Sequence, residues 1–201
     1  MLSIKARKRK KVISFFMRLV TLIKPGDLSL FQIKIIRNLV SIASHRRSRV
    51  TNNTIEKIKI DKLDLYHVKP NELSDKKKIL FFHGGGFFIG NFKIYRNYVS
   101  FLAEVVGREI IFVDYKLSPE SKYPIQLEQA KLAYSFILEK FQGSHVILAG
   151  DSAGGNLALS LFLAVREEKI TKPVGIFCVS PWVNPTAQLS EYPDSFCESD
   201  V

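Results

Sequence analysis

Beyond residue 79 the sequence alternates short, wholly apolar runs with longer segments of helical periodicity, and this alternation constrains the fold more than any other feature. The apolar runs cover residues 79–82, 110–115, 146–149 and 174–179, and helical segments cover residues 95–106, 125–140 and 153–168. Strands that are apolar on both faces are typical of a parallel sheet with helices packed on each side. The sequence therefore predicts an α/β fold: a mostly parallel sheet with helices on both faces.

Residues 55–68 precede this alternating region and have a shorter period. Their apolar residues recur at close spacing in two runs, 55–60 and 63–68, with Asp61 and Lys62 between them. Short apolar runs on either side of a polar pair are typical of two strands joined by a turn. We therefore expect a pair of strands ahead of the parallel sheet.

The positive charge of the chain is concentrated at its N-terminal end. Residues 1–50 contain thirteen Lys or Arg and one acid, Asp27, for a net charge of +12, whereas residues 51–201 contain seventeen Lys or Arg and eighteen Asp or Glu, for a net charge of −1. An enzyme acting on nucleic acid would be expected to carry its basic patch on the folded surface beside the site. We therefore expect no nucleic-acid partner.

The first fifty residues also contain two stretches with apolar residues at helical spacing. The first follows the basic run at residues 5–11, and the second follows Asp27, a residue suited to cap a helix. Their apolar positions are Val12, Phe15, Phe16, Leu19, Leu22 and Ile23, then Leu28, Phe31, Ile35, Leu39 and Ile42. Two interpretations stay open: residues 1–24 contact an anionic membrane surface, or both helices cover the mouth of a site in the main domain. We divide the chain into an N-terminal arm, residues 1–50, and a main domain, residues 51–201.

A glycine-rich turn stands between the apolar run at 146–149 and the helical segment at 153–168. Its residues, Gly150, Asp151, Ser152, Ala153 and Gly154, fit the pattern G-x-S-x-G. A turn this tight needs small neighbours, because a Cβ at Gly150 or Gly154 would collide with the backbone. The Ser152 hydroxyl would then stand at the carboxyl edge of the sheet, beside the N-terminal amides of a helix. The pattern indicates a nucleophilic serine; the alternative is a turn without chemistry.

A second glycine-rich loop follows the apolar run at 79–82. Its sequence is His83, Gly84, Gly85, Gly86 and Phe87. Such a loop can leave backbone N–H groups free to bind an oxyanion. The alternatives are a flexible loop or a phosphate-binding loop, and the latter is disfavoured because no Lys follows the glycines and no G-x-G-x-x-G is present. The serine turn and this loop both follow strands, which favours a single site.

Four motifs together resemble the hormone-sensitive-lipase-like carboxylesterases, a branch of the α/β-hydrolases. They are residues 83–87 (HGGGF), 114–120 (DYKLSPE), 150–155 (GDSAGG) and 180–182 (SPW), in family order and spacing. Lys116 and Ser118 depart from the family pattern, which usually has Arg and Ala there. The resemblance implies an α/β-hydrolase fold in which the N-terminal helices form the cap.

The resemblance also implies hydrolysis of a small or medium acyl ester through an acyl-Ser152 intermediate. By similarity, the amides of Gly85, Gly86 and Ala153 form the oxyanion hole. The remaining motif residues would support the site. By similarity, the segment from Asp114 to Glu120 braces the loops around the site, and His83 is a loop anchor, the alternative being a base. Gly84, Gly150, Asp151 and Gly154 complete the two glycine motifs.

Serine hydrolases also need a base and a carboxylate, and in α/β-hydrolases both follow the serine in the chain. The four histidines, His45, His67, His83 and His145, all precede Ser152. His145 would start the strand that ends at the serine, so it would lie roughly 20 Å away at the opposite end of the sheet. We therefore expect the triad Asp and His to be absent, the sheet to be incomplete at its C-terminal side with an apolar edge at residues 174–179, and this chain alone to be weak or inactive. A second chain supplying both residues, or a non-catalytic remnant that binds a membrane surface, are the alternatives.

Other functional classes leave no pattern in the sequence. The two cysteines, Cys178 and Cys197, form neither a disulfide framework nor a metal-binding spacing, and no metal or organic cofactor is expected. No run of eighteen apolar residues and no secretory signal is present. We expect a cytoplasmic protein, associated with membranes if residues 1–24 act as an anchor.

Overall fold

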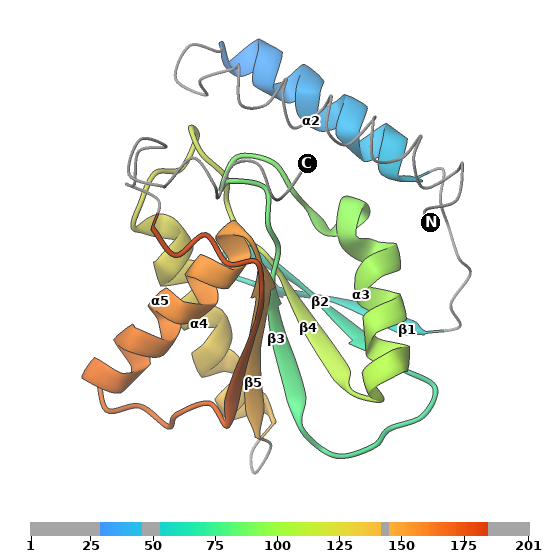
Figure 1. Ribbon diagram of the computed structural model, residues 1–201, viewed down its shortest axis with the longest axis vertical. Helices are drawn as coiled ribbons and strands as arrows, with labels where there is room; N and C mark the ends of the chain where they lie inside the picture. Colours follow the sequence, from blue (N-terminus) through green and yellow to red (C-terminus); the bar gives the residue numbers. More distant parts are fainter. Residues whose placement is uncertain (1–28, 46–52, 142–144, 185–201) are drawn as a thin grey trace, which may run out of the picture. The chain divides into compact units, whose positions relative to one another are not determined.

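The computed structural model describes residues 29–45, 53–141 and 145–184 (Figure 1). The chain separates into two compact units, Met1–Ile36 with Asn184–Val201, and Arg37–Val183. The first predicted helix and the membrane contact of residues 1–24 lie outside the described residues. The predicted boundary at residue 50 also falls outside them. These three points stay predictions. None of the described helices is long and apolar enough to cross a membrane.

A six-stranded sheet in the order β1-β2-β4-β3-β5-β6 organises the second unit. The strands are β1 (Thr54–Ile60), β2 (Leu63–Lys69), β3 (Lys78–Phe82), β4 (Glu109–Asp114), β5 (Val146–Asp151) and β6 (Gly175–Val179). β1 pairs antiparallel with β2 and β2 antiparallel with β4, while β4, β3, β5 and β6 run parallel. The prediction of a strand pair ahead of a mostly parallel sheet is confirmed.

Two hydrophobic clusters lie on the two faces of this sheet. Along β3, Leu80 and Phe82 belong to one cluster, and Ile79 and Phe81 belong to the other, as the period of two in a strand requires. Helices α4 (Ile125–Lys140) and α5 (Ala153–Glu167) pack in the first cluster, and α3 (Phe92–Val106) packs in the second. Figure 1 shows α3 on one side of the sheet and the other two helices on the opposite side. Burial on both faces explains why the central strands are apolar except at their ends.

Helix α2 (Leu30–His45) is the helix expected after Asp27. Its N-terminus is capped by Ser29, whereas the predicted cap, Asp27, lies outside the described residues. Ser29 and Gln32 exchange hydrogen bonds, each side chain accepting from the other's backbone amide, at 3.3 Å and 2.9 Å. This reciprocal arrangement is a capping box, which explains why the helix begins at Leu30.

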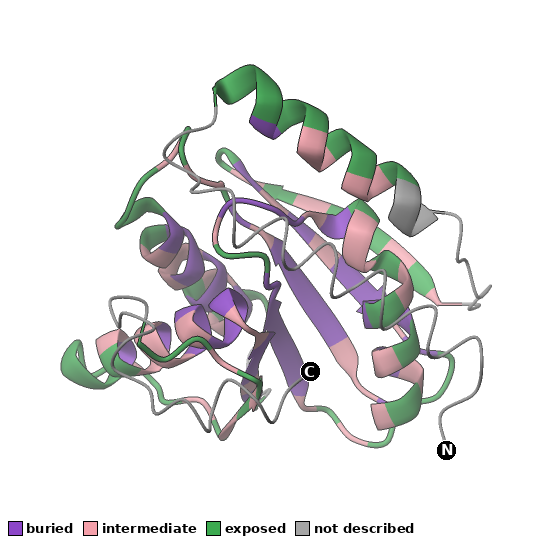
Figure 2. Cartoon of the chain, turned by 45° about the horizontal axis from the view of Figure 1, so that its top comes forward, coloured by how far each residue is buried: buried purple, intermediate pink, exposed green. Residues whose placement is uncertain are grey.

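The predicted apolar face of α2 is its exposed face. Phe31, Ile35, Leu39 and Ile42 are exposed, whereas Ile33 is fully buried. Figure 2 shows most of this helix in the colour of exposed residues. Apolar spacing in the sequence therefore identified a helix but not the side of it that is covered.

The last strand, β6, stands at an edge of the described sheet and pairs only with β5. The side chains of Phe177 and Val179 are exposed, as expected for an apolar edge strand without a second neighbour.

Candidate active site

Ser152 occupies a sharp turn between β5 and α5. Its backbone has φ 50° and ψ −119°, a conformation that residues with a side chain rarely adopt. Two hydrogen bonds of 3.0 Å hold the turn: the Ser152 amide donates to the carbonyl of Val179, and the Ser152 carbonyl accepts from the amide of Trp182. The strained serine is thus held by the segment that follows β6.

The two glycines of the turn are required by close backbone contacts. A Cβ at Gly154 would meet the carbonyl oxygens of Phe82 and His83, and a Cβ at Gly150 would meet the backbone of Gly154. The predicted collision is confirmed. The first turn of α5 is thereby packed directly on the end of β3.

The loop after β3 lies beside the serine turn, because Phe82 and Gly150 are partners in the parallel ladder. Gly85 and Gly86 have φ +114° and +62°, and the Gly85 carbonyl accepts hydrogen bonds from the amides of Phe88 (3.1 Å) and Ile89 (2.9 Å). The amides of Gly85 and Gly86 themselves donate to none of the residues that the structure describes. This turn therefore leaves two N–H groups for an external acceptor.

The N-terminus of α5 supplies further donors at the same edge of the sheet. The first amides of any helix, here beginning with Ala153, have no acceptor within the helix. Together with the positive end of the helix dipole they favour a negative charge beside Ser152.

Asp151 joins the serine turn to the glycine loop. Its carboxylate accepts one hydrogen bond from the amide of Gly84 (3.0 Å) and another from the hydroxyl of Tyr95 (2.8 Å). The Tyr95 hydroxyl also lies 3.0 Å from the Gly84 amide. Burial raises the pKa of the Asp151 carboxyl above its ordinary value, and these hydrogen bonds offset part of that effect. Asp151 is thereby occupied as a brace between the two loops.

The imidazole of His83 is fully buried. It stacks on Tyr115 with ring centroids 4.2 Å apart, and its Nδ1 lies 2.8 Å from the carbonyl oxygen of Gly84. Nδ1 therefore carries the proton and donates. Burial lowers the pKa of His83 to about 4, so the ring is neutral at neutral pH. This environment suits a loop anchor.

The segment after β4 braces the same glycine loop from the other side. The Tyr115 hydroxyl donates to the carbonyl of His83 (2.6 Å), and the Ser118 amide donates to the carbonyl of Phe87 (2.8 Å). Asp114, at the end of β4, is largely desolvated, and burial raises the pKa of its carboxyl to about 6. Its register partner is Asp64 on β2, on the side of β4 away from β3 and β5.

The other two histidines with described side chains lie toward the end of the sheet opposite Ser152, where the parallel strands begin. His145 immediately precedes β5, and its carbonyl accepts from the amide of Lys78 at the start of β3 (2.9 Å). His67 Nε2 lies 3.2 Å from a carboxylate oxygen of Glu109, the first residue of β4. Both therefore stand at the amino ends of the parallel strands, away from Ser152.

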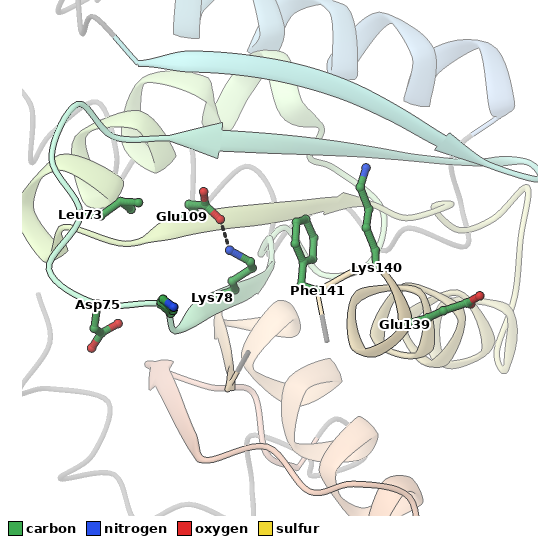
Figure 3. Close-up of a pocket in the computed structure, with 8 residues that line it drawn as sticks. Leu73, Asp75, Lys78, Glu109, Glu139, Lys140 and Phe141 are labelled. Atoms are coloured by element: carbon green, nitrogen blue, oxygen red, sulfur yellow. Dashed lines mark hydrogen bonds and ion pairs between the residues drawn. The ribbon is translucent and has the colours of Figure 1, made fainter. Parts of the chain in front are cut away.

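A cavity of about 540 Å³ opens at this same end of the sheet, where the parallel strands begin (Figure 3). Its lining includes the ion pair of Lys78 and Glu109 and the ring of Phe141, which lies 4.6 Å from the Lys78 ammonium. Since Lys78 and Glu109 begin their strands, this cavity is separate from the serine turn. Among the described residues, no cluster of His, Cys, Asp or Glu is arranged to hold a metal ion.

Residues 79–200 match the family model described as alpha/beta hydrolase fold. The chain belongs to this family. The matched segment contains the serine turn, the glycine loop and the brace from Asp151, so the alpha/beta hydrolase assignment covers every site residue predicted from the sequence.

Relatives of this alpha/beta hydrolase are named as enzymes acting on esters. An acetyl-hydrolase of Streptomyces hygroscopicus is 35% identical over 113 residues, covering 55% of this chain and 37% of the relative. Human hormone-sensitive lipase is 35% identical over 108 residues, covering 51% of this chain and 10% of the relative. The solved structure of an esterase from the bacterial hormone-sensitive lipase family superposes with a TM-score of 0.72 at 26% identity, covering 79% of this chain and 54% of that one. The resemblance to hormone-sensitive-lipase-like esterases is confirmed.

This alpha/beta hydrolase chain spans 37–42% of the length of the first curated relatives that it matches. What those whole proteins do therefore bears on this chain only as a proposal.

Two residues of the site carried no recognised signal in the sequence. Tyr95 lies in α3 and reaches Asp151 across the second core cluster, and Arg37 lies in α2 before every quoted motif. Helical spacing alone does not distinguish Tyr95 or Arg37 from the other residues of their helices. Packing of α3 on the sheet brings Tyr95 to the glycine loop, and Arg37 reaches that loop through its hydrogen bond to the carbonyl of Phe88.

Proposed function

We propose that this chain carries the nucleophile and the oxyanion hole of a carboxylic-ester hydrolase. The observation that carries this proposal is the strained turn of Ser152 at the head of α5, beside the amides of Gly85 and Gly86, which have no partner among the described residues. Backbone strain concentrates at functional sites, and free N–H groups beside a serine hydroxyl suit the oxyanion of acyl transfer. The names of the relatives support an ester as the substrate. A small or medium acyl group is the proposed substrate class.

In the proposed reaction Ser152 Oγ attacks the ester carbonyl and loses its proton to a base. The carbonyl oxygen takes the negative charge and accepts hydrogen bonds from the amides of Gly85, Gly86 and Ala153. Collapse of this intermediate breaks the bond to the alcohol oxygen, which leaves with a proton, and acyl-Ser152 remains. Attack by water on that acyl group completes the hydrolysis and restores the serine.

Slow turnover by this chain alone is part of the proposal, since none of the three histidines whose side chains the structure describes is suited to be the base. His83 is fully buried, and its Nδ1 proton is directed at the Gly84 carbonyl. His67 and His145 stand toward the far edge of the sheet. An oxyanion hole without a base retains part of the rate enhancement and loses most of it.

Chemical rescue with imidazole tests the proposal. The purified chain is incubated with p-nitrophenyl acetate, an ester whose leaving group needs no protonation, with and without added imidazole. Intact-mass and peptide mass spectrometry then measure acetylation of Ser152. We expect slow acetylation of Ser152 that imidazole accelerates, because it supplies the missing base. Ser152→Ala removes the adduct, and the matched control Ser160→Ala, one helix turn or more away on α5, retains it.

Two outcomes would contradict the proposal. Acetylation that persists in the Ser152→Ala variant at the same total level would show that surface groups react instead. A folded chain that acquires no adduct at Ser152, with or without imidazole, would show that the serine turn does not activate its hydroxyl.

A further inference from the structure

The guanidinium of Arg37 connects the two loops that border the serine turn. Its Nε donates to the carbonyl of Phe88 (2.7 Å), at the end of the glycine-loop turn. One Nη donates to the carbonyl of Ser118 (2.6 Å) in the segment after β4. These residues and Arg37 all belong to the same compact unit, Arg37–Val183.

A carboxylate holds this guanidinium in place. Both oxygens of Glu120 accept from Arg37, at 2.7 Å and 3.0 Å, in the paired geometry that arginine forms with carboxylates. The three nitrogen atoms of this planar guanidinium thus donate four hydrogen bonds in all. A lysine ammonium is a single point donor and cannot reach two carbonyls and a carboxylate in this fixed arrangement.

The carbonyl of Phe88 is a sensitive place to hold the glycine loop. The Phe88 amide closes the turn onto the Gly85 carbonyl, and the residue before it, Phe87, has φ 63°. That conformation is unfavourable for a residue with a side chain, so it persists only where neighbours impose it. Contacts on two successive carbonyls impose it here: the Ser118 amide on the Phe87 carbonyl and Arg37 on the Phe88 carbonyl.

We propose that Arg37 is a positioning residue of the oxyanion hole. By fixing Phe88 against the segment at Ser118, it holds the strained turn in which the amides of Gly85 and Gly86 donate to no described residue. A helix that precedes every catalytic motif thereby sets the conformation of the oxyanion-binding loop. This role rests on the proposed function of Ser152.

The first test measures the loop and requires no catalysis. Amide hydrogen exchange is compared for the parent chain, Arg37→Met, Arg37→Lys and the control Arg96→Met, whose side chain is exposed on α3. We expect exchange of the Phe88 and Ile89 amides to rise about tenfold or more in Arg37→Met, because the turn opens locally more often once Arg37 no longer holds it. In Arg37→Lys, exchange is expected to return only partly toward the parent rate. Exchange along β5 is expected to stay at the parent level in all variants.

The second test measures chemistry with p-nitrophenyl acetate and imidazole. Across a range of ester concentrations, the maximal rate of Ser152 acetylation is expected to fall about tenfold in Arg37→Met, because misplaced donors weaken binding of the transition state. The ester concentration at half-maximal rate is expected to stay the same. A purely structural role would instead lower the fraction of folded protein without changing the rate per folded molecule, which near-ultraviolet circular dichroism quantifies.

The outcomes separate the two proposals. Unchanged exchange of Phe88 and Ile89 in Arg37→Met overturns the role of Arg37, and so does an unchanged acetylation rate in a variant of a parent that acetylates Ser152. A parent that never acetylates Ser152 overturns the proposed function of the chain, and the exchange data then still decide whether Arg37 holds the loop.

Discussion

The amide of Gly84 and the carboxylate of Asp151 are joined by a hydrogen bond of 3.0 Å. This bond crosses from the loop after β3 to the strand that ends at Ser152, residues 67 positions apart in the chain. It couples the position of the proposed oxyanion donors to the position of the proposed nucleophile, Ser152. Several consequences can be measured.

Tyr95→Phe is expected to weaken this coupling. The variant removes the hydroxyl that donates to Asp151 (2.8 Å) and leaves a buried carboxylate with one partner fewer. We expect a loss of about 2 kcal/mol in the free energy of unfolding, the cost of a hydrogen bond to a charged group. Urea denaturation measures it. Tyr98→Phe, in the same helix and half exposed, is the control and is expected to stay within about 0.5 kcal/mol of the parent; equal losses in both variants would argue against a special role for Tyr95.

Gly154→Ala tests the packing of α5 against β3. The added Cβ meets the carbonyl oxygens of Phe82 and His83, which are backbone atoms and cannot move aside cheaply. We expect the free energy of unfolding to fall by about 2–4 kcal/mol. Gly175→Ala is the matched control, because a Cβ there meets nothing within 4 Å. Chemical denaturation of the two variants side by side decides the point, and similar stabilities would contradict the packing described here.

Asp114→Asn is expected to stabilise the protein at neutral and higher pH. Burial raises the pKa of Asp114 from 3.8 to about 6, so the folded state binds this proton more tightly than the unfolded state does. The charged carboxylate therefore costs stability, which is lost as pH rises from about 3.8 to about 6. A neutral asparagine removes this cost and is expected to add up to about 3 kcal/mol at pH 8.

Measurements of the Asp114→Asn variant across pH check the sign. The gain in the free energy of unfolding is expected to shrink toward zero below about pH 3, where the parent carboxyl is protonated in both states. The exposed variant Glu72→Gln serves as the control for the loss of one negative charge. A gain in stability that does not change with pH would contradict this explanation, because it could not come from the charge on Asp114.

His83 is expected to remain neutral well into the acid range. Burial lowers the pKa of its imidazole to about 4, so its contribution to stability is present above pH 6.5 and is lost as pH falls toward 4. An NMR titration, with the His83 signal assigned by comparison with His83→Asn, measures the midpoint. A midpoint near 6.5 would instead reveal a ring open to protons and would reopen the question of whether His83 serves as a base.

The order of strands and helices was predictable because burial leaves a period in the chain. Helix α4 occupies the predicted residues 125–140, and β3 and β5 differ from prediction by one or two residues at their ends. Strand ends are harder to place, since the ladder partners of Lys78 and Asp151 decide whether these polar residues extend their strands.

The covered side of α2 was not predictable. Phe31, Ile35 and Leu39 are spaced as a helix face, yet these side chains are exposed while Ile33 is buried. Spacing reports which residues share a face, and contact with the rest of the protein decides which face is covered. The cap of this helix was not predictable either: Ser29 caps it, and Asp and Ser both suit an N-cap, so residue type alone does not choose between nearby candidates.

The sequence by itself determined the α/β fold class, the strand-to-helix turn at Ser152 and the need for glycine at positions 150 and 154. These features follow from local periodicity and from the small space available in a tight turn. Only the tertiary structure decided that Tyr95 and Arg37 hold the glycine loop and that Asp151 braces it. Those contacts join residues 51 to 67 positions apart, and hydrogen bonds at such separations form only after helices and strands have packed.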